Sequence, residues 1–130
     1  MISDTSPLRI AVVGSRGFDD YKLLSRVLDN FFEGTHFTLV CGMARGADLL
    51  GFKYAKRRGW DIEEYPAKWD EHGKSAGYIR NELMSRVSDI VVAFWDGESK
   101  GTKHMITMSL ENNCNLVVIN YKGECSDSLV

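Results

Sequence analysis

Apolar residues along this chain form short continuous runs that alternate with longer stretches in which they recur every three or four residues. Short runs such as Ile10–Val13 and Ile90–Phe94 are typical of strands buried on both faces, and the longer spacing is typical of helices with one apolar side. An irregular stretch, 66–76, and a loop, 95–101, interrupt the pattern. The predicted elements are strand 8–14, helix 20–33, strand 37–41, helix 46–58, strand 61–65, helix 77–87, strand 89–94, helix 102–112 and strand 115–120.

Strands that alternate with helices favour a parallel sheet with helices on both faces. We therefore expect an α/β fold with right-handed crossovers between the strands. In such folds, ligands bind outside the carboxyl ends of the strands, where the strand order reverses. The turns that follow the strands are thus the first place to look for a site.

Three of those turns carry glycine, serine or basic residues directly before a predicted helix. They are Gly14–Gly17, Gly42–Gly46 and Ser99–Thr102. A helix N-terminus presents unpaired N–H groups and a partial positive charge, which suit a phosphate or carboxylate. Arg16 and Arg45 add planar, permanently charged groups. The repetition favours an anion-binding edge, with ordinary turns that carry surface arginines as the alternative.

The irregular stretch 66–76 is long enough to suggest a function. We expect Lys74 at its end, with Arg80 and Asn81 on the following helix, to point into the pocket. For Arg80 the alternative is an exposed helix arginine. Trp69 has two interpretations that stay open: it covers the opening or stacks on a flat group, or it anchors the loop on the domain.

Composition indicates one domain, 1–130, with loose ends at 1–7 and 123–130. The net charge of −2 leaves no bulk basic surface, so anion recognition must come from locally focused charge. No apolar run approaches a membrane span, and the N-terminus lacks the features of a signal peptide, so we expect a cytoplasmic protein without membrane contacts. Three widely spaced cysteines fit neither a disulfide framework nor a zinc site, and we expect no metal and no cofactor.

These turns, together with the stretch 66–81, resemble the sequence motifs of the SLOG superfamily, which is related to DNA-processing protein A and Lonely Guy. Within that superfamily, they resemble the YspA/YpsA-like branch. The resemblance extends from about Leu8 to Ile119. It implies a three-layer Rossmann-like sheet, strand order about 3-2-1-4-5, that binds nucleotides or nucleotide-derived ligands at the strand ends. The motifs that carry it are Gly14-Ser15-Arg16, Cys41-Gly-Met-Ala-Arg-Gly-Ala-Asp48, Pro66…Trp69…Lys74-Ser-Ala-Gly-Tyr-Ile-Arg80-Asn81 and Ser99-Lys-Gly-Thr102.

The resemblance also implies roles for single residues. Ser15 and Arg16 would contact a phosphate or ribose, and Asp48 would cap its turn or accept a hydrogen bond from a ribose hydroxyl. The candidate ligand-binding residues are Gly14, Ser15, Arg16, Gly42, Ala44, Arg45, Gly46, Asp48, Trp69, Lys74, Arg80, Asn81, Ser99, Gly101 and Thr102.

Catalysis is disfavoured by one departure from the family pattern. Lonely Guy relatives hydrolyse the N-glycosidic bond of nucleoside monophosphates with the signature Pro-Gly-Gly-x-Gly-Thr-x-x-Glu, whose glutamate is catalytic. Here Met105 stands at the glutamate position and cannot carry a negative charge. His104 beside it is a weak substitute base, since a histidine at a helix start is more often simply exposed. Arg80 is the one catalytic candidate, and no acid–base pair is visible.

The sequence thus favours a protein that binds a nucleotide-derived small molecule, such as ADP-ribose, a cyclic nucleotide or an NAD-related signal, as a sensor or sequestering protein. The alternative is an N-glycosidase or phosphoribohydrolase-like enzyme. A second alternative is single-stranded DNA binding, which the net charge of −2 and the lack of a basic stripe disfavour. Apolar residues such as Phe31, Phe32, Met105 and Met108 indicate a homo-oligomer, unless they belong to the core.

Overall fold

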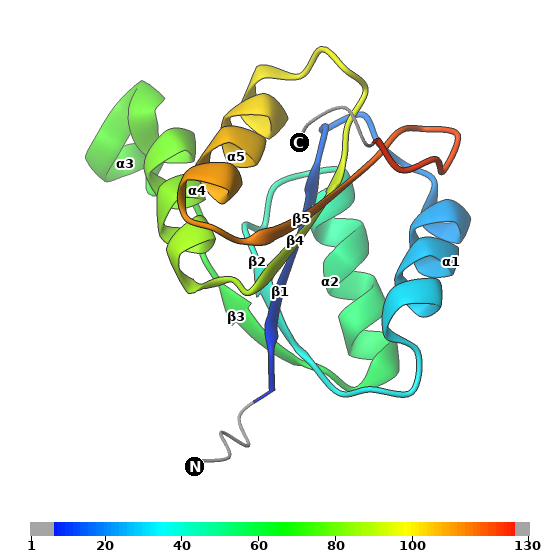
Figure 1. Cartoon of the computed structure of the whole chain (residues 1–130). Helices are drawn as coiled ribbons and strands as arrows, with labels where there is room; N and C mark the ends of the chain where they lie inside the picture. Colours follow the sequence, from blue (N-terminus) through cyan, green and yellow to red (C-terminus); the bar gives the residue numbers. More distant parts are fainter. Residues whose placement is uncertain (1–6, 127–130) are drawn as a thin grey trace.

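A five-stranded parallel sheet forms the centre of the computed structural model, which describes residues 7–126 (Figure 1). The elements agree with the predicted ones to within a few residues at their ends. They are β1 (Arg9–Gly14), α1 (Tyr21–Phe32), β2 (Thr38–Cys41), α2 (Ala47–Arg58), β3 (Asp61–Glu64), α3 (Trp69–His72), the 3₁₀ turn η1 (Gly73–Ser75), α4 (Ala76–Val87), β4 (Ile90–Phe94), α5 (Lys100–Glu111) and β5 (Asn115–Ile119).

The strand order is β3-β2-β1-β4-β5, which confirms the order predicted from the family resemblance. All neighbouring strands are parallel, with Ile10 of β1 opposite Leu39 of β2 on one side and Ile90 of β4 on the other. The order reverses between β1 and β4, so the chain leaves these two neighbours toward opposite faces of the sheet. A crevice is therefore expected at their carboxyl ends.

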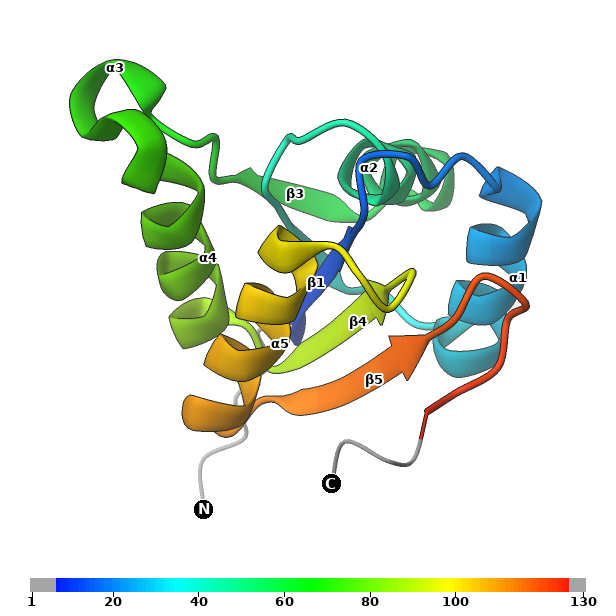
Figure 2. The same ribbon diagram turned by 90° about the horizontal axis from the view of Figure 1, so that it is seen from above.

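Helices cover both faces of the sheet: α1 and α2 pack on one face, and α4 and α5 on the other (Figure 2). Successive β1 residues alternate between the two cores, because side chains of a strand point to opposite faces. Ile10 and Val12 pack with Leu24 of α1, whereas Ala11 and Val13 pack with Met84 of α4. This double burial explains the continuous apolar runs in the sequence.

The stretch predicted to be irregular, 66–76, is partly helical. It holds α3 and η1 before α4 begins at Ala76. The first turn of α3 carries Asp70 and Glu71, which suit a helix N-terminus, and Gly73 with φ +57° ends it. The periodicity of apolar residues could not reveal a helix of four residues with no buried side chain.

The end of the described chain also differs from the expected loose terminus. Residues 123–126 fold back along β5, where Ile119 and Cys125 form an antiparallel bridge and the N–H of Ser126 donates to the carbonyl oxygen of Val118. The Asn120 side chain fixes this turn by accepting hydrogen bonds from the N–H groups of Lys122 and Glu124. The rest of the predicted loose ends, 1–6 and 127–130, lies outside the described residues.

Two of the four apolar residues that suggested an oligomer belong to the core. Phe32 and Met105 are buried, while Phe31 is half-exposed on α1. Within residues 7–126, none of the helices is long and apolar enough to cross a membrane.

Candidate functional site

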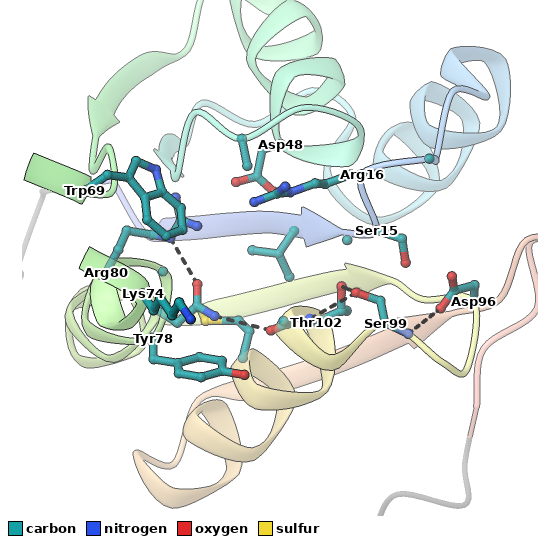
Figure 3. Close-up of a pocket in the computed structure, with 18 residues that line it drawn as sticks. Ser15, Arg16, Asp48, Trp69, Lys74, Tyr78, Arg80, Asp96, Ser99 and Thr102 are labelled. Atoms are coloured by element: carbon teal, nitrogen blue, oxygen red, sulfur yellow. Dashed lines mark hydrogen bonds between the residues drawn. The ribbon is translucent and has the colours of Figure 1, made fainter. Parts of the chain in front are cut away.

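A cavity of ≈ 470 Å³ opens at the carboxyl edge of the sheet (Figure 3). Its volume falls in the range usual for small-molecule sites. Figure 3 shows Ser15, Ser99 and Thr102 at one end of the cavity, and Trp69, Lys74 and Tyr78 at the other. The candidate residues that line it are Gly14, Ser15, Arg16, Ala44, Asp48, Trp69, Lys74, Arg80, Asn81, Ser99, Gly101 and Thr102.

The first turn of α5 lines one end of the cavity. Asp96 Oδ1 accepts hydrogen bonds from the N–H groups of Glu98 and Ser99, both at 2.8 Å, and these bonds lower the pKa of the Asp96 carboxyl. Ser99 caps the helix, because its Oγ accepts from the N–H of Thr102 at 3.4 Å. The first N–H groups of the helix, at Lys100 and Gly101, have no intrahelical acceptor.

Ser15 lies beside this turn with its hydroxyl unpaired. The residue is only 4% exposed, and its Oγ has no hydrogen-bond partner among the described residues. The Ser15 hydroxyl is a minor cause of the lowered pKa of Asp96, so the two side chains lie near each other. Their geometry does not meet the criteria for a hydrogen bond, and Ser15 Oγ therefore counts as unpaired. A buried polar group left unpaired costs about 1–3 kcal/mol. A ligand atom that bonded to Ser15 Oγ would remove that cost.

Asp48 and Arg80 both line the cavity and lie close to Gly42. Asp48 is buried, and this burial raises the pKa of its carboxyl to about 7, against the opposing effect of Arg80 and the N–H groups of Ala44 and Gly42. Burial also lowers the pKa of Arg80, which donates from Nη1 to the carbonyl oxygen of Gly42 and from Nε to Asn81 Oδ1. A Cβ at Gly42 would lie 2.6 Å from Asp48 Oδ2 and 2.8 Å from Arg80 Nη1. A side chain at position 42 would therefore displace one or both of the two charged groups.

Three candidate residues, Gly42, Arg45 and Gly46, do not line the main cavity. Gly46, with φ +85°, packs the turn after β2 against the turn after β1, since an added Cβ would lie 2.7 Å from the carbonyl oxygen of Arg16. Arg45 is exposed and, with Gly42, lines an adjoining cavity of ≈ 300 Å³. Arg16 and Thr102 thus share the main cavity, and Arg45 lies outside it.

Asn81 of α4 joins this helix to α5 through a hydrogen bond beside the cavity. Its Nδ2 donates to the carbonyl oxygen of Gly101 at 3.2 Å and lies 3.3 Å from His104 Nδ1. The His104 ring packs on Tyr78, with 4.4 Å between the ring centroids, and burial lowers the pKa of His104. Met105, at the position of the Lonely Guy glutamate, is buried in the cavity wall.

Two aromatic rings flank the opening. Trp69 is 50% exposed and Tyr78 is 48% exposed, although both line the cavity. Half of the Trp69 side chain is thus exposed, and both interpretations of it, a cover or stacking surface and an anchor of the loop, stay predictions. Tyr78 was not among the ligand-binding residues predicted from the sequence. Its position in the first turn of the helix that follows the long connection could have indicated it.

Several other lining residues were not predicted as ligand contacts, namely Val13, Gly17, Gly77, Asp96 and Met105. Asp96 lies two residues after the end of β4, so its position near a strand end was the signal for it. Within residues 7–126, no group of three or more His, Cys, Asp or Glu side chains is placed to hold a metal ion.

The sheet order and the crevice beside its reversal define a Rossmann-like α/β protein. A model of the YAcAr family, described as the YspA, cpYpsA-related SLOG family, matches residues 8–72, and the chain belongs to this family. The predicted SLOG membership is confirmed.

Two known proteins extend the comparison. The chain is 32% identical over 121 residues to the Gene 61 protein of Mycobacterium phage D29, covering 87% of this chain and 95% of the phage protein. The fold is similar to that of DNA processing protein A from Streptococcus pneumoniae, with a TM-score of 0.69, 16% identity and 88% of this chain covered. The chain spans about half of that protein, covering 50% of it, and the likeness shows the shared fold alone.

Proposed function

We propose that this protein binds a nucleotide-derived small molecule and holds a phosphate between Ser15 and the first turn of α5. The observation that carries the proposal is the buried, unpartnered Ser15 Oγ beside a capped helix N-terminus. A phosphate accepts hydrogen bonds from a hydroxyl and from helix N–H groups at once, and the helix dipole favours its charge. Family membership and the position of the crevice support a ligand of this class.

The rest of the cavity suits the remainder of a nucleotide. Arg16, Lys74 and Arg80 supply positive charge around it. Trp69 and Tyr78 offer flat surfaces on which a base can stack. The proposed ligands are ADP-ribose, cyclic nucleotides and NAD-related molecules, and the proposed role is that of a sensor or a sequestering protein.

Isothermal titration calorimetry with AMP, ADP-ribose and cyclic AMP tests the proposal. We expect at least one of them to bind, and Ser15→Ala to weaken its binding about fivefold or more, while the free variant is at least as stable as the wild type because it no longer buries an unpaired hydroxyl. The matched control is Thr35→Ala, which removes an exposed hydroxyl shortly before β2, near the amino end of that strand and so opposite to the cavity edge. Absence of binding by all three probes, or equal binding by both variants, would contradict the proposal.

Asp48 favours a second candidate function, hydrolysis of an N-glycosidic bond. A buried carboxyl in a cavity with a pKa of about 7 is suited to exchange a proton with a substrate near neutral pH. The test is incubation with AMP, followed by chromatography for free adenine. Release that disappears in Asp48→Asn supports the enzyme; no release from AMP by the wild type argues for binding alone.

A further inference from the structure

The ≈ 300 Å³ cavity beside the main one has a boundary in common with it. Four residues line both: Arg16, Ala44, Trp69 and Arg80. The remaining walls of the second cavity come from the turn after β2 and from the chain that follows β3. A ligand bound in the main cavity can therefore extend past these shared side chains into the second one.

Charge distinguishes the two cavities. The main cavity places Asp48 and Asp96 among its cations, whereas the described lining of the second contains arginines and no carboxylate. Among residues 7–126, the guanidinium groups of Arg16 and Arg45 form no ion pair and no hydrogen bond. Arg80, which adjoins both cavities, is partly occupied by Gly42 and Asn81. The second cavity thus concentrates uncompensated positive charge.

Two of these cations, Arg16 and Arg80, already repel each other. The positive charge of Arg16 contributes to lowering the pKa of Arg80. An anion beside Arg16 and Arg45 would offset this repulsion and accept charge-assisted hydrogen bonds, which are about twice as strong as neutral ones. Arginine also binds phosphate through two parallel hydrogen bonds.

The uncharged walls suit a sugar or a base. Met43, Pro66 and Ala67 line the second cavity together with the Trp69 ring. Small and apolar side chains leave room for a flat or cyclic group, and the half-exposed Trp69 ring lies where both cavities meet.

We propose that the Arg45 cavity is a second binding subsite, so that the two cavities together select a nucleotide carrying a second phosphate separated from the first by a nucleoside. The inference rests on the proposed function, because the first phosphate is the one placed at Ser15 and α5. It narrows the ligand class from nucleotides in general to bisphosphates and dinucleotides.

Calorimetry on the full chain at low salt tests this with three probes: AMP, adenosine 3′,5′-bisphosphate and the linear dinucleotide 5′-pApA. We expect at least one two-phosphate probe to bind about tenfold or more tightly than AMP. Arg45→Ala removes that gain and leaves AMP affinity within about twofold, while Arg45→Lys retains part of it since charge remains without the planar fork.

A second variant tests whether the ligand occupies the volume of the second cavity, independently of the charge of Arg45. Ala67→Phe fills the second cavity and is expected to abolish the gain for pApA while AMP still binds. Lys22→Ala is the matched control, because it removes an exposed cation on α1, away from both cavities.

The outcomes separate the two proposals. If AMP binds but neither two-phosphate probe binds more tightly, or if the gain survives both Arg45→Ala and Ala67→Phe, the second subsite is overturned and the proposed function stands. If none of the three probes binds, the second subsite is overturned, and the titrations with ADP-ribose and cyclic AMP decide the proposed function.

Discussion

Arg80 on α4 donates a hydrogen bond from Nη1 to the carbonyl oxygen of Gly42, a residue 38 positions earlier in the chain. The bond joins a helix on one face of the sheet to the turn after β2. It also brings the guanidinium close to the buried Asp48 carboxyl. A contact between distant segments thus holds Arg80 in the wall of the main cavity, and the first two predictions concern its neighbours.

Replacing Gly42 by alanine should destabilise the protein by about 1–3 kcal/mol, because the new Cβ would lie 2.6 Å from Asp48 Oδ2 and 2.8 Å from Arg80 Nη1. Urea denaturation measures the change. The control is Gly101→Ala in the first turn of α5, where an added Cβ has no neighbour within 4 Å. That variant should be neutral or slightly stabilised. Equal effects of the two substitutions would contradict the steric argument.

Asp48 should make the free energy of unfolding depend on pH. Its pKa is about 7 in the folded protein and about 3.9 when unfolded, so the folded state binds more protons between these values. Stability from this group is therefore complete below about pH 4, falls as the pH rises, and is lost above about pH 7. Relative to Asp48→Asn, the wild type should lose about 3 kcal/mol between pH 5 and pH 8.

Urea denaturation at several pH values checks this, with Asp96→Asn as the control. The pKa of Asp96 is lowered, so its contribution is present above its unfolded value and should stay constant from pH 5 to pH 8. Parallel pH profiles for the wild type and Asp48→Asn would show that Asp48 does not titrate in this range.

Trp69 should report ligand binding. Base stacking on its half-exposed ring is expected to quench its fluorescence, and Trp69→Ala should weaken binding of AMP by about 1–3 kcal/mol. Trp69→Phe, which keeps an aromatic surface, should bind with a smaller loss but without the fluorescence change. If Trp69→Ala binds as tightly as the wild type, the ring only covers the opening.

Tyr54 should stabilise the fold without affecting the site. Its hydroxyl donates to Asp29 Oδ1 at 2.6 Å, and Asp29 also pairs with Arg58 at 2.9 Å, joining α1 to α2. Tyr54→Phe is expected to cost about 1–2 kcal/mol in thermal or urea unfolding. Tyr121→Phe, at an exposed position, should cost little. A reduced affinity for nucleotide in Tyr54→Phe would show a coupling that the contacts do not explain.

The homo-oligomer stays a prediction, and Phe31 is the residue that tests it. Its ring is 48% exposed on α1. Sedimentation equilibrium should give a mass above the 14.7 kDa of one chain, and Phe31→Ser should shift the mass toward that value if α1 contributes to the interface. If the wild type has the mass of one chain, the protein does not self-associate and the prediction of a homo-oligomer is wrong.

The order of strands and helices could be predicted from the sequence because it depends on local periodicity. Runs such as Ile10–Val13 are continuous because β1 packs on both faces, and the turn glycines mark where strands end. The four-residue α3 escaped prediction, since a helix without a buried face leaves no periodic signal. The strand order itself came from the family resemblance rather than from the pattern.

The sequence by itself determined the class of fold, the turns at the strand ends and most of the residues that meet in the main cavity. Only the tertiary structure decided that Ser15 is left unpaired, that Asp48 is buried beside Arg80, and that Arg45 lies in a separate cavity. The physical reason is that periodicity is a property of neighbouring residues, whereas burial, hydrogen-bond partners and the shape of a cavity depend on segments that meet only after the sheet has formed.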